Sequence, residues 1–318
     1  MRPVFIGGCG RSGTTLLGSM LGGHSRCLTI PEAQFIYEGI KFYENKNKLN
    51  IDEAKEILNF IENHWRFKIW GLRINKSDIC LKASNSYSEI INKIINQYGK
   101  EVNKSNFDLW INHTPENIRY IDTLMKLFPD AKFIHLVRDG RAVYNSWLST
   151  DWGPNTAIKA AHSWLESISF GLAAESFLGE SLIKRIRYED LILNSEKTIK
   201  DICDFLNIDY QEDMLEGKGF KVPSYTICQH KLVGKKPDKS RLYSWKNKLS
   251  TRDVEIFEYI TGECLLYLGY DLIGGINPKP LTNFERIQSI VLEIFKGQIV
   301  NRFKRKRRIM HSIKNFNY

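Results

Sequence analysis

The chain has 318 residues, of which 42% are hydrophobic and 26% charged, a composition typical of an ordinary globular protein. The formal net charge is +10 at pH 7, but the segment from Lys296 to the end holds eight Lys and Arg residues and no acidic residue. The rest of the chain is therefore nearly neutral, so the basic character is a property of the C-terminal segment and does not predict nucleic-acid binding.

The cysteines and histidines predict no metal site. None of the six cysteines forms a Cys-x-x-Cys pair, and the seven histidines show no i, i+4 pairing, so neither a zinc site nor a disulfide framework is expected. We take the first strand, which begins at Pro3, to leave no room for a leader peptide. No stretch reaches the ~18 apolar residues of a membrane span. We therefore expect a cytoplasmic protein, either free or peripheral at a membrane.

The N-terminal stretch predicts a strand, an anion-binding loop and a helix. An apolar run from Val4 to Ile6 leads into a group of glycines, and the apolar spacing of a helix begins at Leu16. Glycines let the backbone turn tightly and present N–H groups to an anion, and the N-terminus of the next helix adds partial positive charge. The loop residues expected to bind the anion are Arg11, Ser12, Gly13, Thr14 and Thr15.

The same loop argues against a nucleotide triphosphatase. The spacing from Gly8 to Gly13 fits a Walker A loop, but Thr14 stands where such an enzyme carries the lysine that reaches the γ-phosphate. Arg11 instead supplies a planar fork that can bind an oxyanion at two points. The alternative is an ordinary glycine-rich turn without a ligand.

The next hundred residues are predicted to be mainly helical. A loop over residues 24–32 ends at Glu32, and a polar surface loop covers residues 45–50. Apolar residues recur with the helical period over 52–68 and 86–98. We expect these helices to form an inserted region spanning about residues 35–106.

Strands and helices then alternate. Residues 108–112 and 132–137 are apolar runs expected to be strands, and residues 182–186 form a third. Helices are expected from Pro115 to Phe128, from about 140 to 147 and from 155 to 178. This alternation predicts an α/β fold with a parallel central sheet and helices on both faces. Ligands of such folds bind beyond the carboxyl ends of the strands.

After the last predicted strand, one more helix and then a separate C-terminal segment are expected. A helix over residues 251–268 stops at Gly269, and residues 274–280 form a linker. A helical stripe of apolar residues from Phe284 to Ile294 then precedes the basic cluster at 302–308. Such a segment suits an anionic membrane surface. The alternative is a packed helix followed by a disordered tail.

Two anion-binding motifs together resemble the sulfotransferases that use 3'-phosphoadenylyl sulfate (PAPS), in particular the tyrosylprotein and carbohydrate branch. The first motif is the loop at residues 11–15, and the second places Arg138 at a strand end and Ser146 eight residues later. The likeness spans residues 3–270. It implies a P-loop-like sulfotransferase domain over 1–273, in which the inserted helices bind the acceptor, and a separate segment over 274–318.

The resemblance implies a role for each matching residue. The loop, including Arg11, would bind the 5'-phosphosulfate, and Arg138 with Ser146 would bind the 3'-phosphate. Tyr188 would lie near the adenine, and Lys236 belongs to a basic loop expected to close over the nucleotide.

Two further residues are candidates for the chemistry. Glu32 falls where the tyrosylprotein branch carries its general base, although Pro-Glu is also an ordinary helix start. His113 stands where relatives carry a lysine that stabilises the leaving oxygen, and it is either a donor there or a structural histidine.

The resemblance therefore implies an enzyme that moves a sulfuryl group from PAPS to a hydroxyl of a saccharide, a lipid-linked glycan or a tyrosine. Adenosine 3',5'-bisphosphate would be released, and no metal is required because arginines and backbone dipoles can neutralise the transferring group. The alternatives are a P-loop kinase or nucleotide hydrolase, and a non-catalytic membrane-surface binding protein.

Overall fold

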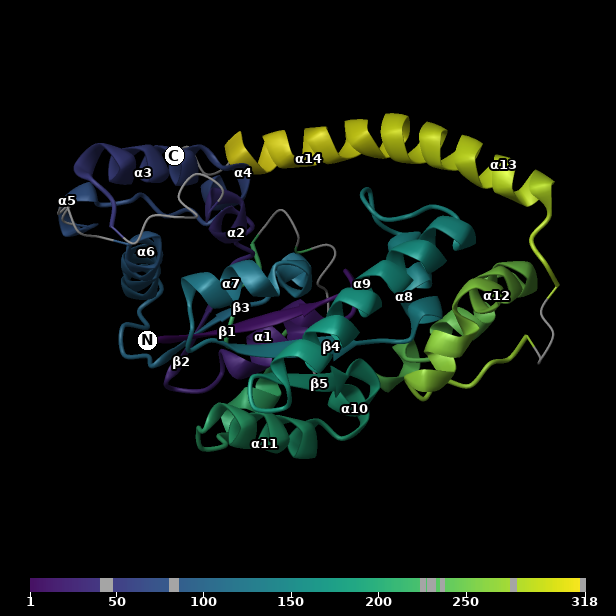
Figure 1. The fold of residues 1–318 in the computed structure, drawn as a ribbon, viewed down its shortest axis with the longest axis horizontal. Coiled ribbons are helices and arrows are strands. Elements are labelled where there is room, and N and C mark those ends of the chain that lie inside the picture. The colour runs from purple at the N-terminus through teal and green to yellow at the C-terminus, as the bar shows by residue number, and fades with distance from the viewer. Residues whose placement is uncertain are drawn as a thin grey trace.

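The protein folds around one parallel sheet, as a computed structural model shows (Figure 1). The structure describes residues 1–40, 48–79, 86–223, 227, 233–234, 238–274 and 279–314, with side chains up to residue 310 except that of Asp78. The predicted contact of Lys236 lies outside these residues. Five strands lie in the order β2-β3-β1-β4-β5, and every neighbouring pair is parallel. Their bounds are β1 Arg2–Gly8, β2 Cys27–Ile30, β3 Leu109–Asn112, β4 Lys132–Val137 and β5 Ile183–Arg187.

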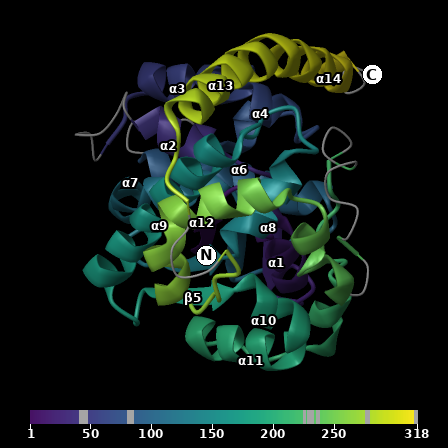
Figure 2. The ribbon, with the colours of Figure 1, turned by 90° about the vertical axis from the view of Figure 1, so that its right-hand side faces the viewer.

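Helices cover both faces of the sheet, as predicted (Figures 1 and 2). Alternate residues of β1 point to opposite faces: Val4 and Ile6 pack with α1, α10 and α11, whereas Phe5 packs with α6 and α7. The helices around the sheet are α1 Thr14–Leu21, α7 Ile121–Leu127, α8 Gly140–Trp147, α9 Ala157–Leu178, α10 Tyr188–Leu193, α11 Ser195–Leu206 and α12 Thr251–Tyr267. Short 3-10 turns lie at Pro115–Arg119, Glu212–Glu216, Lys239–Arg241 and Ser244–Asn247.

Two predicted elements around the central strands are corrected. The expected loop over residues 24–32 contains β2, whose four residues are all buried. The expected helix from Pro115 to Phe128 is a 3-10 turn followed by α7, with a break at Tyr120. The Asn117 amide donates to the carbonyls of Ile6 and Asn112 at 3.1 Å each. These bonds hold the 3-10 turn against the ends of β1 and β3.

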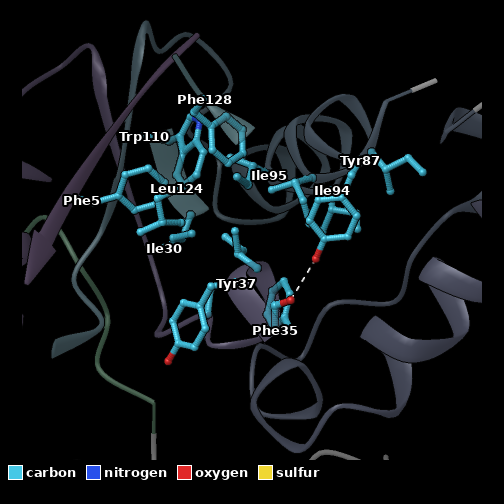
Figure 3. Close-up of a cluster of buried hydrophobic side chains, with 14 of the residues drawn as sticks. Phe5, Ile30, Phe35, Tyr37, Tyr87, Ile94, Ile95, Trp110, Leu124 and Phe128 are labelled. Atoms are coloured by element: carbon cyan, nitrogen blue, oxygen red, sulfur yellow. Dashed lines mark hydrogen bonds between the residues drawn. The ribbon is translucent and has the colours of Figure 1, made fainter. Parts of the chain in front are cut away.

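The inserted region consists of short helices that share one hydrophobic core with a face of the sheet. They are α2 Phe35–Gly39, α3 Ile51–Asn63, α4 Trp65–Lys68, α5 Lys76–Ile79 and α6 Tyr87–Glu101. The helix predicted over 52–68 is interrupted at His64, whose extended backbone ends α3 and whose ring accepts from the Arg66 N–H to start α4. Figure 3 shows that isoleucines of α6 join the aromatic cluster beside β1, and that the Tyr87 hydroxyl donates to the Phe35 carbonyl at 2.9 Å. The region is thereby packed onto the sheet.

The C-terminal segment is one long helix lying across the molecule. It comprises α13 Asn283–Leu292, a π-helical stretch Glu293–Asn301 (η7) and α14 Arg302–Lys314. It runs along one side of the protein from the α12 end towards α3 and α4 (Figures 1 and 2). The basic cluster is therefore helical, and the alternative of a disordered tail is wrong for the residues up to Lys314. No helix in the described part of the chain is long and apolar enough to cross a membrane.

Four cysteines can be assessed in the structure. Cys9, Cys27 and Cys203 are buried, Cys264 is half-buried, and all four are free thiols. Burial raises the pKa of Cys9 and Cys27 to about 12, so both are protonated and unreactive at neutral pH.

Candidate active site

The predicted anion-binding residues meet at the carboxyl ends of the strands, where they line one cavity of about 1810 Å³. Arg11, Gly13, Thr14 and Thr15 line it after β1, Glu32 after β2, Arg138 after β4 and Tyr188 after β5, and Ser146 lines it from α8. Single-ligand pockets usually measure ~300–1,000 Å³. The cavity therefore has room for two substrates side by side.

The loop after β1 has the shape of an anion-binding turn. Arg11 and Gly13 have backbone φ angles of 74° and 100°, in the left-handed region that is costly for most residues. The Ser12 N–H donates to the Cys9 carbonyl at 3.0 Å. Ser12 itself is fully buried, and its hydroxyl has no hydrogen-bond partner among the residues that the structure describes.

The two predicted anion motifs are joined by direct contacts. The Arg11 Nε donates to the Ser146 hydroxyl at 3.1 Å, and an Arg138 Nη donates to the Arg11 carbonyl at 2.8 Å. The Arg138 guanidinium also lies over the Tyr188 ring, 4.3 Å from its centroid. A Cβ on Gly13 would lie 2.5 Å from that ring. The glycine therefore allows the ring to pack against the loop.

A buried polar network fixes the second motif. The Asp139 carboxylate accepts from the Arg141 N–H at 2.9 Å at the start of α8. Glu189 accepts from the Asp139 N–H at 3.1 Å and from the Tyr270 hydroxyl at 2.9 Å. Burial raises the pKa of Glu189. These bonds tie the ends of β4 and β5 together, so Arg138 and Tyr188 are placed on rigid elements.

Glu32 lies on the cavity wall in an ion pair. Its carboxylate accepts from an Arg66 Nη of α4 at 2.8 Å, and the Trp70 indole donates to its backbone carbonyl at 3.3 Å. Glu116, from the turn after β3, lines the same cavity. Nearby protein atoms and the charge of Glu32 raise the pKa of Glu116, although its side chain is exposed to solvent. The cavity thus holds two carboxylates with different environments, an arrangement suited to proton transfer.

His113 lies behind the cavity wall. It is 2% exposed and is absent from the cavity lining in the described part of the protein. Its ring packs edge-on against Phe220 and beside Gly18, where a Cβ would come within 3.0 Å. Burial lowers its pKa, so the ring is neutral at pH 7. Neither ring nitrogen has a hydrogen-bond partner among the described residues, so the donor role and the structural role both stay predictions.

Further basic residues also face the cavity: some come from the predicted basic loop and the basic cluster at 302–308, and Arg66, Lys248 and Lys296 belong to no predicted motif. Arg66 comes from α4, Arg241 and Lys248 flank the Ser244–Asn247 turn, and the C-terminal helix contributes Lys296, Lys304, Arg305 and Arg308. With Arg11 and Arg138, nine basic residues face three acidic ones, Glu32, Glu116 and Asp151. The cavity is therefore electropositive and suits anionic ligands.

The C-terminal helix also supports the loop that carries Trp152. Glu293 accepts from the backbone N–H groups of Asn155 and Thr156 at 2.7 and 2.9 Å. Trp152 lies so close to Gly10 that a Cβ there would come within 3.0 Å of the indole. No sequence motif could have revealed this, because the partners are more than 130 residues apart. Within the ranges described above, no three His, Cys, Asp or Glu side chains gather in a way that could hold a metal ion.

Comparison with known proteins identifies a family. Residues 3–212 match the sulfotransferase family. Similar proteins include protein-tyrosine sulfotransferase A of Caenorhabditis elegans, 27% identical over 67% of this chain, and a protein-tyrosine sulfotransferase of Drosophila melanogaster, 25% identical over 69%. This chain spans 51% and 41% of the lengths of those two relatives.

Solved structures show the same fold. A sulfotransferase domain from the olefin synthase of Synechococcus PCC 7002 has a TM-score of 0.59 at 22% identity, and the match covers 85% of this chain and 96% of that one. A sulfotransferase domain from the curacin biosynthetic pathway has a TM-score of 0.55 at 20% identity, covering 86% of this chain and 99% of that one. The likeness to these domains extends over most of the chain, beyond the 3–212 match.

Proposed function

Because the chain belongs to the sulfotransferase family, we propose that its donor is PAPS and that it transfers the sulfuryl group to an acceptor hydroxyl, releasing adenosine 3',5'-bisphosphate. The observation that carries this proposal is the contact of Arg138 with the Arg11 carbonyl, at 2.8 Å. This bond brings two anion-binding motifs into one site, as a donor with a 5'-phosphosulfate and a separate 3'-phosphate requires.

Each end of the donor has its own set of groups in this proposal. Arg11, Thr14, Thr15 and the N-terminus of α1 face the 5'-phosphosulfate, where donors and partial positive charge favour an anion. Arg138 and Ser146 bind the 3'-phosphate. Tyr188 offers a ring to the adenine. Arg11, Arg138, Ser146 and Tyr188 are held by contacts with one another, so they can stabilise charge with little reorganisation.

Glu32 is the proposed general base. Its carboxylate lies on the cavity wall and is held by Arg66 at 2.8 Å, so it can accept the proton of a hydroxyl that attacks sulfur in line. Arg11 would stabilise the charge that develops on the transferring group. His113 is not given a direct role, because its neutral ring is enclosed behind the wall.

The acceptor class remains open among a tyrosine peptide, a saccharide and a lipid-linked glycan. The names of the similar proteins make a tyrosine peptide the first acceptor to test.

The test is a transfer assay with purified protein. Radiolabelled PAPS is offered with each of the three acceptor classes, and γ-labelled ATP is offered in parallel. We expect label to pass from PAPS to one acceptor class, with no transfer or hydrolysis of ATP. At limiting donor the Arg138→Ala variant should transfer about 10- to 100-fold less label than the parent protein. Phosphoryl transfer from ATP without sulfuryl transfer from PAPS would establish the kinase alternative instead.

A further inference from the structure

The outer face of the C-terminal helix carries a continuous apolar stripe. Seven residues recur along it at spacings of three, four or seven, and all are substantially exposed: Phe284 (73%), Ile287 (62%), Val291 (58%), Phe295 (58%), Ile299 (48%), Phe303 (73%) and Met310 (50%). Phe295 is the one member of this set that also lines the cavity. We call these residues the outer stripe. Contiguous exposed apolar surface of this kind marks an interaction site.

The opposite face of the helix is polar and bound to the protein. Ser289 shares a 2.7 Å hydrogen bond with Thr156, Asn301 donates to the Asn155 side chain at 3.1 Å, and Arg308 pairs with Asp151 at 2.8 Å. The helix is therefore held with its polar face inward and its apolar stripe outward, the reverse of an ordinary surface helix.

The π-helical stretch keeps this orientation along the whole length. The inward residues Ser289, Glu293 and Asn301 are spaced by four or eight. In an α-helix with 3.6 residues per turn, each step of four residues rotates by about 40° beyond a full turn. The wider turn of Glu293–Asn301 reduces this drift. The inner contacts and the outer stripe therefore both continue from α13 into α14.

Cations flank the outer stripe. Arg302, Lys306 and Arg307 are exposed and lie outside the lining of the cavity. The two acidic residues of the segment 283–314 are already engaged by the protein: Glu285 with Arg252 and Glu293 with the backbone of Asn155. The outward surface thus combines apolar side chains with positive charge that no other acidic residue of the segment 283–314 balances.

We propose that the outer stripe, together with Arg302, Lys306 and Arg307, docks the protein on an anionic lipid bilayer. An interfacial helix buries its apolar face at the boundary between headgroups and acyl chains, while its cations meet anionic headgroups. A lipid surface offers acyl chains to the apolar stripe and anionic headgroups to the cations along the whole length of the helix. A second copy of this chain would instead bring its own cationic cluster to the interface.

Docking would place the cavity at the lipid surface, because the same helix forms part of the cavity wall through Lys296, Lys304 and Arg305. If the proposed function holds, the acceptor is then a hydroxyl-bearing molecule presented by the membrane. This consequence rests on the proposed function, whereas the docking itself does not.

Vesicle flotation with the full chain tests the charged part of the surface. Vesicles of phosphatidylcholine alone are compared with vesicles that also contain phosphatidylserine. We expect binding only to the second kind, and a loss of about 100-fold in partition for Arg302→Gln/Lys306→Gln/Arg307→Gln, because each cation near such a surface contributes about fivefold. Binding that is equal for both vesicles, or unchanged in the triple variant, would overturn the proposal.

A second variant tests the outer stripe independently. Val291→Gln/Ile299→Gln/Phe303→Gln changes three outward residues that do not line the cavity, and we expect it to abolish flotation. Phe177→Gln/Leu266→Gln is the matched control, since these residues are also exposed (81% and 53%) but lie on α9 and α12. The control should float like the parent protein, and equal losses in both would contradict the assignment.

Oligomeric state separates a membrane from a second copy as the occupant. The proposal expects sedimentation velocity to give the same mass for the parent and for the stripe variant, with the same circular dichroism. A parent dimer that becomes a monomer in the stripe variant, with no vesicle binding by either, would show that the stripe is covered by a second copy and would overturn the proposal.

Discussion

Substitution of Gly13 by alanine tests whether Tyr188 and Arg138 act as one unit in nucleotide binding. The new Cβ would lie 2.5 Å from the Tyr188 ring, whereas carbon atoms in contact prefer ~3.5–4.0 Å. The ring must therefore move by about 1 Å or more, away from its place under the Arg138 guanidinium, which now lies 4.3 Å from the ring centroid.

The free-energy cost of Gly13→Ala has two parts, backbone strain and the clash with Tyr188, and a control variant can separate them. Gly13 has a φ of 100°, and a side chain in the left-handed region costs about 1–2 kcal/mol of stability wherever it occurs. Gly217 has a φ of 60°, but a Cβ there would meet nothing closer than 3.7 Å. Gly217→Ala therefore shares the conformational cost without the clash.

We expect the two variants to differ in nucleotide affinity. The Gly13→Ala variant should bind adenosine 3',5'-bisphosphate roughly 2- to 30-fold more weakly than the parent protein, because it loses the cation–π contact. Gly217→Ala should bind it like the parent protein. Calorimetric titration of both variants is the measurement, with thermal unfolding to show that both are folded at the working temperature. Equal affinities for Gly13→Ala and the parent would refute the reasoning.

Three other perturbations follow from the site and its supports. Glu32→Gln should lower turnover by about 10²- to 10⁴-fold with nearly normal donor affinity, as the loss of a general base does. Arg138→Ala should weaken binding of adenosine 3',5'-bisphosphate about 10- to 100-fold, with a smaller loss for adenosine 5'-phosphate. The hydrogen bonds from Arg252 lower the pKa of Glu285 to about 2, so this carboxylate stabilises the fold above its unfolded pKa of about 4.3, and the contribution is lost as the pH falls towards 2. Thermal unfolding across that pH range should show a smaller acid-induced loss in Glu285→Gln than in the parent.

Each of these expectations has a contrary result. Parent-like turnover of Glu32→Gln at saturating donor and acceptor would place the base elsewhere, with Glu116 next in line on the cavity wall. If Arg138→Ala lost the same affinity for both nucleotides, Arg138 would not be the residue that binds the 3'-phosphate. An identical pH profile in Glu285→Gln would show that the pair with Arg252 does not help to hold the C-terminal helix.

Local patterns were enough to predict the core of the site. The strand at Val4–Ile6, the glycine loop and the start of α1 follow from residues within 20 positions of one another. The strand that ends at Arg138 and the helix that carries Ser146 are equally local. Because parallel strands end at a common edge, the sequence also predicted that these motifs meet, and the contact between Arg138 and the Arg11 carbonyl bears this out.

Elements that depend on distant neighbours were missed. The segment Cys27–Ile30 becomes a strand because β3 offers it a partner, and four residues carry too little periodicity to show this alone. The break at Tyr120 follows bonds of Asn117 to two strands. Arg66 and Glu116 reach the cavity only because α4 and the turn after β3 are packed beside it.

The C-terminal segment shows most clearly which features can be predicted from sequence and which depend on tertiary contacts. The order of its residues was enough to predict an amphipathic basic helix, because the helical spacing of apolar residues and the clustering of charge are both local features of the sequence. The sequence pattern does not determine which face of this helix packs against the rest of the protein. The orientation is set by hydrogen bonds of Glu293 and Asn301 to the loop at Asn155 and Thr156. Polar groups buried without a partner are costly because they lose their hydrogen bonds to water, and these bonds remove that cost. The polar face therefore lies against the protein, and the apolar stripe faces outward.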